Sequence, residues 1–243
     1  MNVILFPSSA WVSSEKSSGN QVVITDSSVI RHIQIVLGAG VGDTLKVGEI
    51  GGQLGVAKIV DMCDDGVVLA EVRLDTPPSP KLDLTLILAL PRPKVLRRLI
   101  MDMTAMGVNH IILLNSARTD KSYWGSPLLA RMDEYLLEGL QQGVDTVMPK
   151  VTIAKRFKPF VQDELPSIIG ENTAIVAHPY ADASFGQACQ DGLPKVLIVG
   201  AEGGFVPYEI ELLASVGARA ASLGSRILRT ESAVNALLGR WLD

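Results

Sequence analysis

Cysteine is the scarcest residue type that carries information in this chain. Only Cys63 and Cys189 occur among the 243 residues, and their separation matches no metal-binding or redox spacing. Two isolated cysteines in a reducing compartment are most simply core or surface residues. The sequence therefore predicts neither a metal site nor a redox motif.

Long apolar runs are also missing. No run reaches the roughly 18 residues that a membrane span requires. The opening segment Met1–Pro7 lacks the basic start and the full apolar core of a signal peptide. With 47% apolar and 20% charged residues, the composition is that of a soluble globular protein of one or two domains. We therefore expect a cytoplasmic protein that makes no contact with a membrane.

Glycine is absent from one informative place, the turn Leu90–Lys94 between an expected strand and an expected helix. The glycine-rich phosphate loops of dinucleotide-binding enzymes and of P-loop kinases both require glycines in such a turn. Those two classes of enzyme are therefore disfavoured.

Positive charge is limited, with 22 Lys and Arg against 26 Asp and Glu and a net charge of −4. This balance argues against binding nucleic acid by bulk charge. Residues 1–76 hold five basic and nine acidic residues, which leaves seventeen of each for residues 77–243. An RNA-binding surface must therefore be a local patch in the second part, where basic clusters can equally be ordinary solvated faces. The clusters are Arg92, Lys94, Arg97 and Arg98; Arg118 and Lys121; and Lys150, Lys155, Arg156 and Lys158.

The first part of the chain alternates short β-type runs with turn residues, which is typical of a small barrel or sandwich. The expected strands are Val3–Phe6, Gln21–Ile24, Thr44–Val47, Leu54–Val60 and Val67–Arg73. One helix, Ser27–Leu37, is expected to interrupt them, with Asp26 or Ser27 as its cap and with Ile30, Ile33 and Val36 facing inward. Three prolines in Asp75–Pro80 predict a stiff linker, so we place the domain boundary between residues 75 and 76.

The second part alternates apolar strands with helices, which predicts an open α/β layer fold around a parallel sheet. The expected strands are Leu82–Leu90, His110–Asn115, Lys150–Ile153, Thr173–Ala177, Lys195–Val199 and Ala220–Leu223. The expected helices run to Met106, over Pro127–Gln142, Phe157–Glu164 and Tyr208–Val216, and through the C-terminal segment that ends at Trp241 and Leu242. Ligands of such folds bind outside the carboxyl ends of the strands.

Two loops lie at such strand ends. Gly200-Ala201-Glu202-Gly203-Gly204 follows one apolar strand, and Leu223-Gly224-Ser225-Arg226-Ile227-Leu228-Arg229-Thr230-Glu231 connects another to the last helix. Glycines permit unusual turns and close backbone approach, and a helix N-terminus offers free N–H groups to a polar ligand. We therefore expect one binding site built from both loops.

Together these motifs resemble the signature of the bacterial 16S rRNA uridine-N3 methyltransferases, which are members of the knotted SPOUT superfamily. The second motif matches throughout apart from Ser232, where the family usually has Thr, and the first differs at Ala201, where proline is normal. The resemblance implies a SPOUT-type trefoil-knotted parallel sheet with helices on both faces in residues 76–243. It also implies a small PUA-like β-barrel, which helps to bind RNA, in residues 1–75.

The same resemblance implies that the cofactor is S-adenosylmethionine, bound in a bent shape by the two loops. The residues expected to hold it are Gly200, Ala201, Glu202, Gly203, Gly204, Leu223, Gly224, Ser225, Ile227 and Leu228. The expected RNA-binding residues are Arg92, Lys94, Arg118 and Arg226. The partners implied are 16S rRNA of the small ribosomal subunit and a second copy of the chain.

Methylation at N3 of uridine requires removal of an imide proton, which a general base or a cation beside the developing anion assists. Arg229 is the expected cation at the uracil carbonyls, and Glu231 or Glu202 the group that orients the base or takes the proton. We hypothesise that Arg229 and Glu231 act as a unit. The alternative is that these two residues form a structural ion pair.

Several positions depart from the pattern of the family. The family usually carries charged residues, all but one of them basic, at the positions of Gly38, Asp102, Ala105 and Asp145.

From the resemblance, the expected function is S-adenosylmethionine-dependent methylation of uridine N3 in 16S rRNA. The alternative is an RNA- or ribosome-binding paralogue that keeps the cofactor pocket but has a different target or no methyl transfer.

Overall fold

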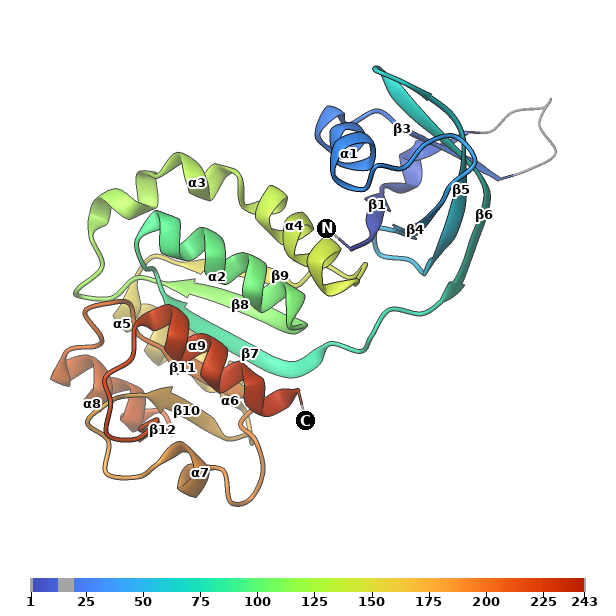
Figure 1. The fold of residues 1–243 in the computed structure, drawn as a ribbon. Helices are drawn as coiled ribbons and strands as arrows, with labels where there is room; N and C mark the ends of the chain where they lie inside the picture. The colour runs from blue at the N-terminus through green and yellow to red at the C-terminus, as the bar shows by residue number, and fades with distance from the viewer. Residues whose placement is uncertain (1, 13–19, 243) are drawn as a thin grey trace. The chain divides into compact units, whose positions relative to one another are not determined.

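The computed structural model describes residues 2–12 and 20–242 and divides the chain into two compact units (Figure 1). Unit 1 comprises the chain up to Pro80 together with the segment Leu140–Met148. Unit 2 comprises Lys81–Gly139 and Pro149 onward. The boundary after Pro80 lies at the end of the proline segment predicted to be the linker, and the last strand of unit 1 continues through Asp75 and Thr76.

Unit 1 is built on a curled six-stranded sheet with the strand order β1-β4-β5-β6-β3-β2. Its strands are β1 (Ile4–Phe6), β2 (Trp11–Val12), β3 (Gln21–Ile24), β4 (Thr44–Glu49), β5 (Leu54–Cys63) and β6 (Gly66–Thr76). β1 pairs with β4 in parallel, and all other pairs are antiparallel. Alternate residues point inward, as Val22 and Ile24 do on β3, and they form one apolar core.

β-Bulges curl this sheet. The pairing of β5 with β6 shifts register at three places along its length. At Gly55, a Cβ atom would lie 1.8 Å from the carbonyl oxygen of Arg73, so only glycine permits the close approach of the two strands. Glu71 on β6 has a φ of 50°, a left-handed conformation that is unusual for a residue other than glycine.

The expected helix after β3 is present but changes its winding. It consists of α1 (Ser27–Arg31) and a π-helical turn, η2 (His32–Val36), and the Asp26 carboxylate caps it by accepting from the N–H groups of Ser28 and Val29. The wider π turn moves the following residues off the buried face. Val36, predicted to face inward, is therefore 69% exposed, whereas Ile30 and Ile33 are buried as predicted.

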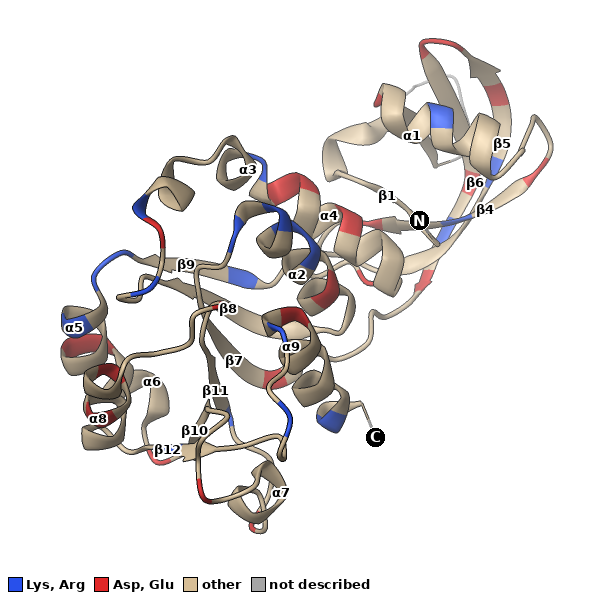
Figure 2. Cartoon of the chain, turned by 60° about the vertical axis from the view of Figure 1, so that its left-hand side comes forward, with Lys and Arg blue, Asp and Glu red and all other residues tan. Residues whose placement is uncertain are grey.

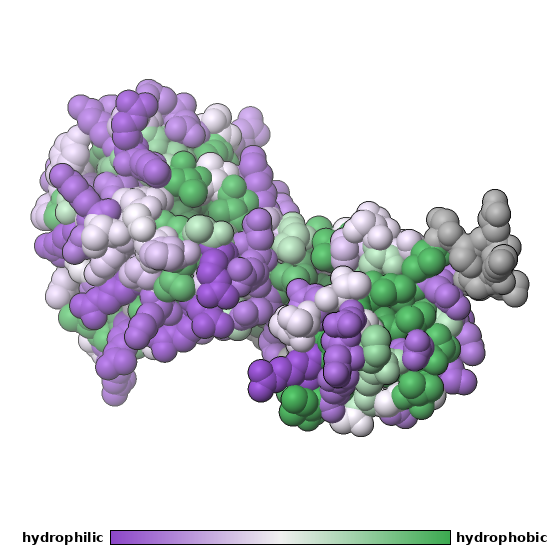
Figure 3. Space-filling view, turned by 90° about the horizontal axis from the view of Figure 1, so that it is seen from above, coloured by the Kyte–Doolittle hydropathy of each residue, from purple (hydrophilic) through white to green (hydrophobic). Residues whose placement is uncertain are grey.

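Apolar side chains consequently reach the surface of unit 1 (Figure 3). Four of them, in and just after the π turn, are Ile35, Val36, Leu37 and Val41. Gly38 ends the helix with a φ of 61°, which explains glycine at a position where the family usually carries a charged residue.

A segment from the middle of the chain completes unit 1. Thr146 is fully buried, its hydroxyl donates to the carbonyl of Gly52 (2.5 Å), and its carbonyl accepts from the N–H of Gly51 (2.8 Å). Near the other end of unit 1, the N–H of Asn2 donates to the carbonyl of Gln141 (2.9 Å). From the sequence we predicted that this segment belongs to the second domain, because composition can divide a chain only into contiguous stretches.

Unit 2 contains a six-stranded sheet in which every pair of strands is parallel, with the order β12-β10-β11-β7-β8-β9. Its strands are β7 (Leu82–Ala89), β8 (Val108–Leu114), β9 (Lys150–Ala154), β10 (Ala174–Ala177), β11 (Val196–Val199) and β12 (Ala218–Ala221). The parallel α/β sheet expected from the apolar strands is therefore confirmed.

Helices cover both faces of this sheet. One core includes Leu86 and Leu88 of β7 with residues of α2 (Pro93–Ala105), α4 (Met132–Gly143) and α9 (Thr230–Leu238). The other includes Ile87 and Ala89 of β7 with residues of the helix formed by α5 (Phe157–Pro159), η4 (Phe160–Glu164) and α6 (Leu165–Ile169), and of α8 (Pro207–Ser215). Successive side chains of β7 thus pack against helices on opposite faces of the sheet.

Several boundaries differ from the predicted ones. The helix expected over Pro127–Gln142 is interrupted at Arg131, between α3 (Pro127–Ala130) and α4. The helix expected to end at Glu164 continues to Ile169, because the π turn η4 lets it pass Pro166. A short helix, α7 (Phe185–Ala188), was not predicted, and the last strand begins at Ala218 rather than Ala220. None of the helices in the described residues is long and apolar enough to cross a bilayer.

Candidate active site at the carboxyl edge of the parallel sheet

The carboxyl ends of all six strands of unit 2 meet at one edge, because every pair is parallel. β10 lies between β11 and β12, so the two predicted loops flank a third loop, His178–Ser184. The N–H of His178 donates to the carbonyl of Ala221 (2.9 Å), and the N–H of Ser222 donates to the carbonyl of Ala183 (2.9 Å). Three adjacent loops therefore form the candidate site.

The loop after β11 is a tight turn that depends on glycine. Gly204 has a φ of 65°, and its N–H donates to the carbonyl of Ala201 (2.8 Å). A Cβ atom on Gly200 would lie 3.0 Å from the Cα of Gly204. The chain thus folds back on itself within five residues, and a side chain at either glycine would disturb this turn.

Contacts from the segments that follow β7 and β8 hold this loop. The Glu202 carboxylate accepts from the backbone N–H of Arg92, just after β7, at 3.1 Å. The Arg118 guanidinium, from the loop after β8, donates to the carbonyl of Gly203. Arg92 and Arg118 were predicted to bind RNA, and the structure places both of them directly beside the glycine loop.

The loop after β12 exposes its side chains. Residues 224–229 are all exposed, including Ile227 at 70% and Leu228 at 40%. Gly224 has a φ of 104°, which a residue with a side chain rarely adopts. The expected strand Ala220–Leu223 ends earlier, at Ala221, so Leu223 belongs to this loop. This loop therefore exposes two apolar side chains, Ile227 and Leu228, to solvent together with two arginines, Arg226 and Arg229.

Arg229 and Glu231 are close in sequence but have different environments. Arg229 is exposed at the N-terminal cap of α9, whereas Glu231 in the first turn accepts from the guanidinium of Arg98 on α2 at 2.8 Å. The ion pair of Glu231 is thus made with Arg98, not with Arg229 as the alternative interpretation of the sequence had it. Arg229 forms no ion pair within residues 2–12 and 20–242.

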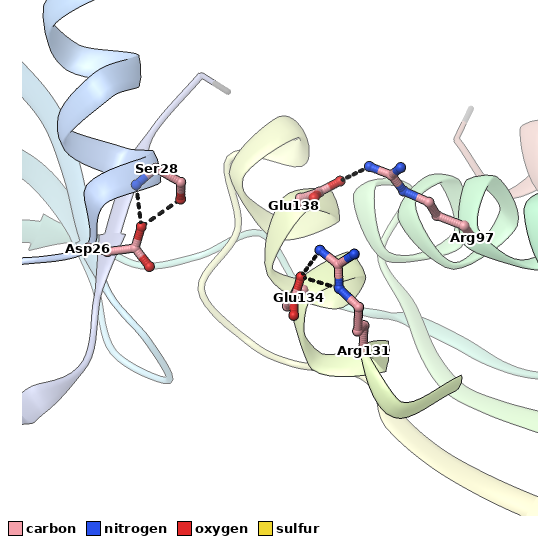
Figure 4. Close-up of polar contacts among 6 residues, drawn as sticks. All are labelled: Asp26, Ser28, Arg97, Arg131, Glu134 and Glu138. Atoms are coloured by element: carbon pink, nitrogen blue, oxygen red, sulfur yellow. Dashed lines mark hydrogen bonds and ion pairs between the residues drawn. The ribbon is translucent and has the colours of Figure 1, made fainter. Parts of the chain in front are cut away.

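Two of the four cations predicted on α2 and at its N-terminal cap form ion pairs. Arg98 binds Glu231, and Arg97 contacts Glu138 on α4 at 3.3 Å (Figure 4). Arg92 and Lys94 are exposed and form no ion pair in the described part of the chain. Within the described residues, the two cations selected as RNA-binding residues are therefore the two of this cluster that make no ion pair.

Two positions that depart from the family pattern have structural roles here. The Asp102 carboxylate accepts from the side-chain amide of Asn235 on α9 (3.0 Å). Asp145 is buried, and its carboxylate accepts from the N–H groups of Thr146 (2.7 Å) and Val147 (3.0 Å). Acidic residues at these positions thus stabilise local structure.

Sequence reasoning missed two residues near the site. Glu209 is 3% exposed, and its carboxylate accepts from the N–H groups of Ala117 (2.7 Å) and Val206 (3.0 Å), which joins the loop after β8 to the start of α8. A glutamate two residues after Pro207 is a helix-start signal that the sequence did carry. His178 directly follows β10, and burial lowers its pKa, which favours the neutral imidazole.

Comparison with known proteins agrees with this architecture. Residues 77–242 match the RNA methyltransferase domain family. The chain is 30% identical to ribosomal RNA small subunit methyltransferase E of Treponema pallidum over 96% of its own length and 87% of that protein. The chain belongs to the ribosomal RNA small subunit methyltransferase E family. Ribosomal RNA small subunit methyltransferase E 1 of Borreliella burgdorferi is 31% identical over 62% of the chain and 63% of its own length.

Solved structures give the same fold. Ribosomal RNA small subunit methyltransferase E of Neisseria gonorrhoeae, bound to S-adenosyl methionine, superposes with a TM-score of 0.77 at 20% identity and covers 99% of this chain and 96% of that one. A putative methyltransferase of Legionella pneumophila, in complex with the same cofactor, gives 0.75 at 20% identity. The predicted fold class, an α/β domain with a parallel sheet preceded in the chain by a small curled β-sheet domain, is confirmed, and it is consistent with a SPOUT domain and a PUA-like barrel.

Proposed function

We propose that this chain is an S-adenosylmethionine-dependent RNA methyltransferase that methylates N3 of a uridine in 16S rRNA. The observation that carries the proposal is the convergence of three loops, each following a parallel strand, on one edge of the sheet in a member of the methyltransferase E family. Two of these loops have backbone conformations that only glycine adopts readily. The name of the Treponema pallidum relative supplies the substrate class.

The loops fit the cofactor in two respects. Positive φ angles at Gly204 and Gly224, and the close approach of Gly200 to Gly204, leave backbone rather than side chains facing a ligand. Ile227 and Leu228 offer exposed apolar surface of the kind that packs against a purine. We assign the cofactor to the loops Gly200–Gly204 and Leu223–Leu228, where S-adenosylmethionine would supply the electrophilic methyl group.

Arg229 is the residue we place at the uracil. Its guanidinium is exposed, is fixed at the start of α9, and has no acidic partner in the described residues, so a ligand anion can bind it. The imide N3–H is a weak acid, and a cation beside the uracil carbonyls stabilises the anion left when the proton passes to solvent. Such assistance is worth roughly 10²- to 10⁴-fold in rate.

The two carboxylates then act as positioning residues. Glu231 is held by Arg98 and fixes the first turn of α9, directly after Arg229. Glu202 holds the glycine loop against the start of α2 through the Arg92 N–H. Arg92, Lys94, Arg118 and Arg226 are all exposed around these loops, and we assign them to RNA phosphates.

The remaining parts of the proposal concern the whole protein. We assign unit 1, as a PUA-like barrel, to RNA binding, the protein to the cytoplasm, and the active form to a homodimer. Leu237 and Leu238 of α9 are fully buried in the core of unit 2, so they do not supply the dimer contact. Leu242 remains 56% exposed. Sedimentation equilibrium over a wide concentration range tests the dimer, and a monomer throughout would contradict it.

The function is tested by methyl transfer to small ribosomal subunits isolated from a strain that lacks the gene. Wild-type protein should produce 3-methyluridine in 16S rRNA, identified by mass spectrometry of nucleosides. Arg229→Ala should abolish the product while S-adenosylmethionine binding, measured by calorimetry, is largely kept. Arg240→Ala, which removes an exposed arginine after α9, is the matched control and should methylate normally.

Other outcomes have definite meanings. Cofactor binding without any methylated nucleoside would contradict the enzyme proposal and favour the RNA-binding paralogue. A methylated base other than 3-methyluridine would retain the enzyme class and overturn the position. An Arg229→Ala protein that fails to fold would assign Arg229 to structure instead of chemistry.

A further inference from the structure

A second cluster of aromatic and basic side chains lies at the same edge of the sheet, beyond the loops assigned to the cofactor. It is formed where β8 and β9 end, and we call it the β9 edge: Trp124, Lys155, Arg156 and Lys158. Neither the cofactor loops nor the RNA contacts assigned above include these residues. All three cations are exposed and form no ion pair within the part of the chain that the structure describes.

Trp124 is fixed in this cluster by the strand ends themselves. Its indole N–H donates to the side-chain oxygen of Asn115 at 2.8 Å, and the backbone N–H of Asn115 donates to the carbonyl of Ala154 at 2.9 Å. Asn115 directly follows β8, and Ala154 is the last residue of β9. The short helix η3 (Lys121–Gly125), capped by the Asp120 carboxylate, carries the tryptophan to this position.

Lys155 covers the tryptophan with a positive charge. Its Nζ lies 5.8 Å from the centroid of the Trp124 ring, a cation–π arrangement. Arg156 follows it at the N-terminal cap of α5, and Figure 2 shows basic segments at the start of α5 and in the loop that leads from β8 to α3. A small cavity of about 190 Å³ beside them is lined by Lys155, Arg156 and Phe160, with Glu164 at its wall.

This combination has the chemistry of a single-stranded RNA contact. An indole offers a stacking face to any unpaired base, and flanking cations bind phosphates without regard to sequence. A chain with a net charge of −4 must concentrate such cations locally to bind RNA at all. The Lys155 ammonium lies 5.8 Å from the Trp124 ring on a flexible side chain, so it can move from the ring to a phosphate. A base can then stack on the ring in its place.

We propose that the β9 edge binds the single-stranded RNA next to the modified nucleotide, with Trp124 stacking on one unpaired base and Lys155 and Arg156 contacting its phosphates. The inference rests on the proposed function for the identity of the RNA. It adds a contact surface on the β8–β9 side of the cofactor loops, whereas Arg226 and Arg229 lie on the β12 side. The substrate would thus contact both sides of the cofactor site.

The test compares two lysines of one strand. Lys155 follows β9 at its carboxyl end and Lys150 begins the same strand at the opposite edge, and both are exposed. Binding of a fluorescein-labelled single-stranded 12-nucleotide RNA is measured by anisotropy at several salt concentrations. Lys155→Gln should weaken binding and lower the slope of log affinity against log salt by about 0.7. Lys150→Gln should change neither quantity.

Trp124 provides the independent arm of the test. Trp124→Ala should weaken binding about 5- to 150-fold, the range of one lost base stack. Because Trp124 also packs against the core, Trp124→Phe is measured as a second variant that keeps the fold. Because the chain has three tryptophans, their fluorescence is compared between variants. If RNA quenches the fluorescence of the wild type but not that of Trp124→Phe, the quenching is assigned to the Trp124 ring.

Failure of this inference is separable from failure of the proposed function. S-adenosylmethionine affinity is measured on the same variants and should be unchanged. Equal RNA binding by Lys155→Gln, Lys150→Gln and wild type would overturn the inference, and so would tighter binding of a duplex of the same length. The expected binding pattern in a protein that transfers no methyl group would support the RNA contact and contradict the enzyme proposal alone.

Discussion

At the scale of single residues, Glu202 lies in the candidate site, where its carboxylate accepts a hydrogen bond from the backbone N–H of Arg92. Glutamine keeps an oxygen that accepts this hydrogen bond but removes the charge, whereas alanine removes both. We expect Glu202→Gln to bind S-adenosylmethionine and transfer methyl groups close to wild type. Glu202→Ala should lose about 10- to 150-fold in cofactor affinity, the value of a hydrogen bond to a charged group. Calorimetry and a methyl-transfer assay measure both.

The opposite pattern would change the role of Glu202. Normal cofactor binding by Glu202→Gln together with a rate loss of about 10²-fold or more would identify its carboxylate as the general base for N3. The two substitutions therefore separate positioning from proton transfer at one residue.

Glu209 is the second carboxylate for which the structure predicts a measurable effect. Both of its oxygens accept backbone N–H groups in a buried site. In Glu209→Gln, the amide NH₂ would face one of these donors, so we expect a loss of about 1–3 kcal/mol in the free energy of unfolding. Glu211→Gln on the exposed face of the same helix is the control and should be neutral. Urea denaturation measures both, and equal stabilities would show that the Glu209 contacts contribute nothing.

Residue identity was easier to predict than residue contacts. The glycine loops and Arg229 were found from the sequence because their motif is contiguous and lies directly after apolar strands. The Arg98–Glu231 pair, in contrast, joins residues 133 positions apart in two helices, and the pairing of Glu202 with Arg92 spans 110. Such contacts depend on strand order, and no local pattern shows that β11 is adjacent to β7.

At the scale of elements, the helical period of the sequence does not predict the π turn after α1 and therefore places Val36 on the wrong face. The π turn ends at Gly38, whose φ of 61° costs a residue with a side chain about 1 kcal/mol, although no atom of the described residues lies within 4 Å of its Cβ position. Gly38→Arg, which restores a charge there, should therefore lower the free energy of unfolding by about that amount. Gly40→Ala, in equally open space without a positive φ, should be neutral.

The same variant tests the departure from the family pattern. Thermal unfolding gives the stability of Gly38→Arg, and binding of the single-stranded RNA gives its affinity. Unchanged stability would contradict the role assigned to the helix end. Increased RNA affinity despite lower stability would show that this position is still oriented toward RNA.

Most elements were predictable because strand and helix periods are local, whereas their ends and their winding were not. The break at Arg131 and the π turn at Phe160–Glu164 both occur inside apolar patterns that read as continuous helices. Tertiary packing decides such details, since the buried face must follow the sheet and not an ideal helix.

At the scale of the whole molecule, unit 1 is not a contiguous domain. Thr146 packs beneath Gly48, where a Cβ would lie 2.9 Å from its methyl group, and bonds to Gly51 and Gly52. A fragment that ends at Pro80 lacks this segment and exposes the side chains of Leu5 and Leu54 around it. A domain of this size has a free energy of unfolding of about 4–12 kcal/mol. Four hydrogen bonds join the segment to the fragment, from Asn2 to Gln141 and Gln142 and between Thr146 and both Gly51 and Gly52, and their loss removes about 2–6 kcal/mol of it. We therefore expect fragment 1–80 to be marginally folded.

Joining residues 140–148 to this fragment through a flexible linker should restore its stability. Urea denaturation followed by circular dichroism compares the two fragments, and a version with Thr146→Ala serves as the matched control with an intermediate midpoint. Equal midpoints for all three would show that the inserted segment contributes no stability and that the contiguous boundary expected from the prolines is sufficient. A higher midpoint only with intact Thr146 would show that the barrel requires a part of the chain that the sequence assigns to the other domain.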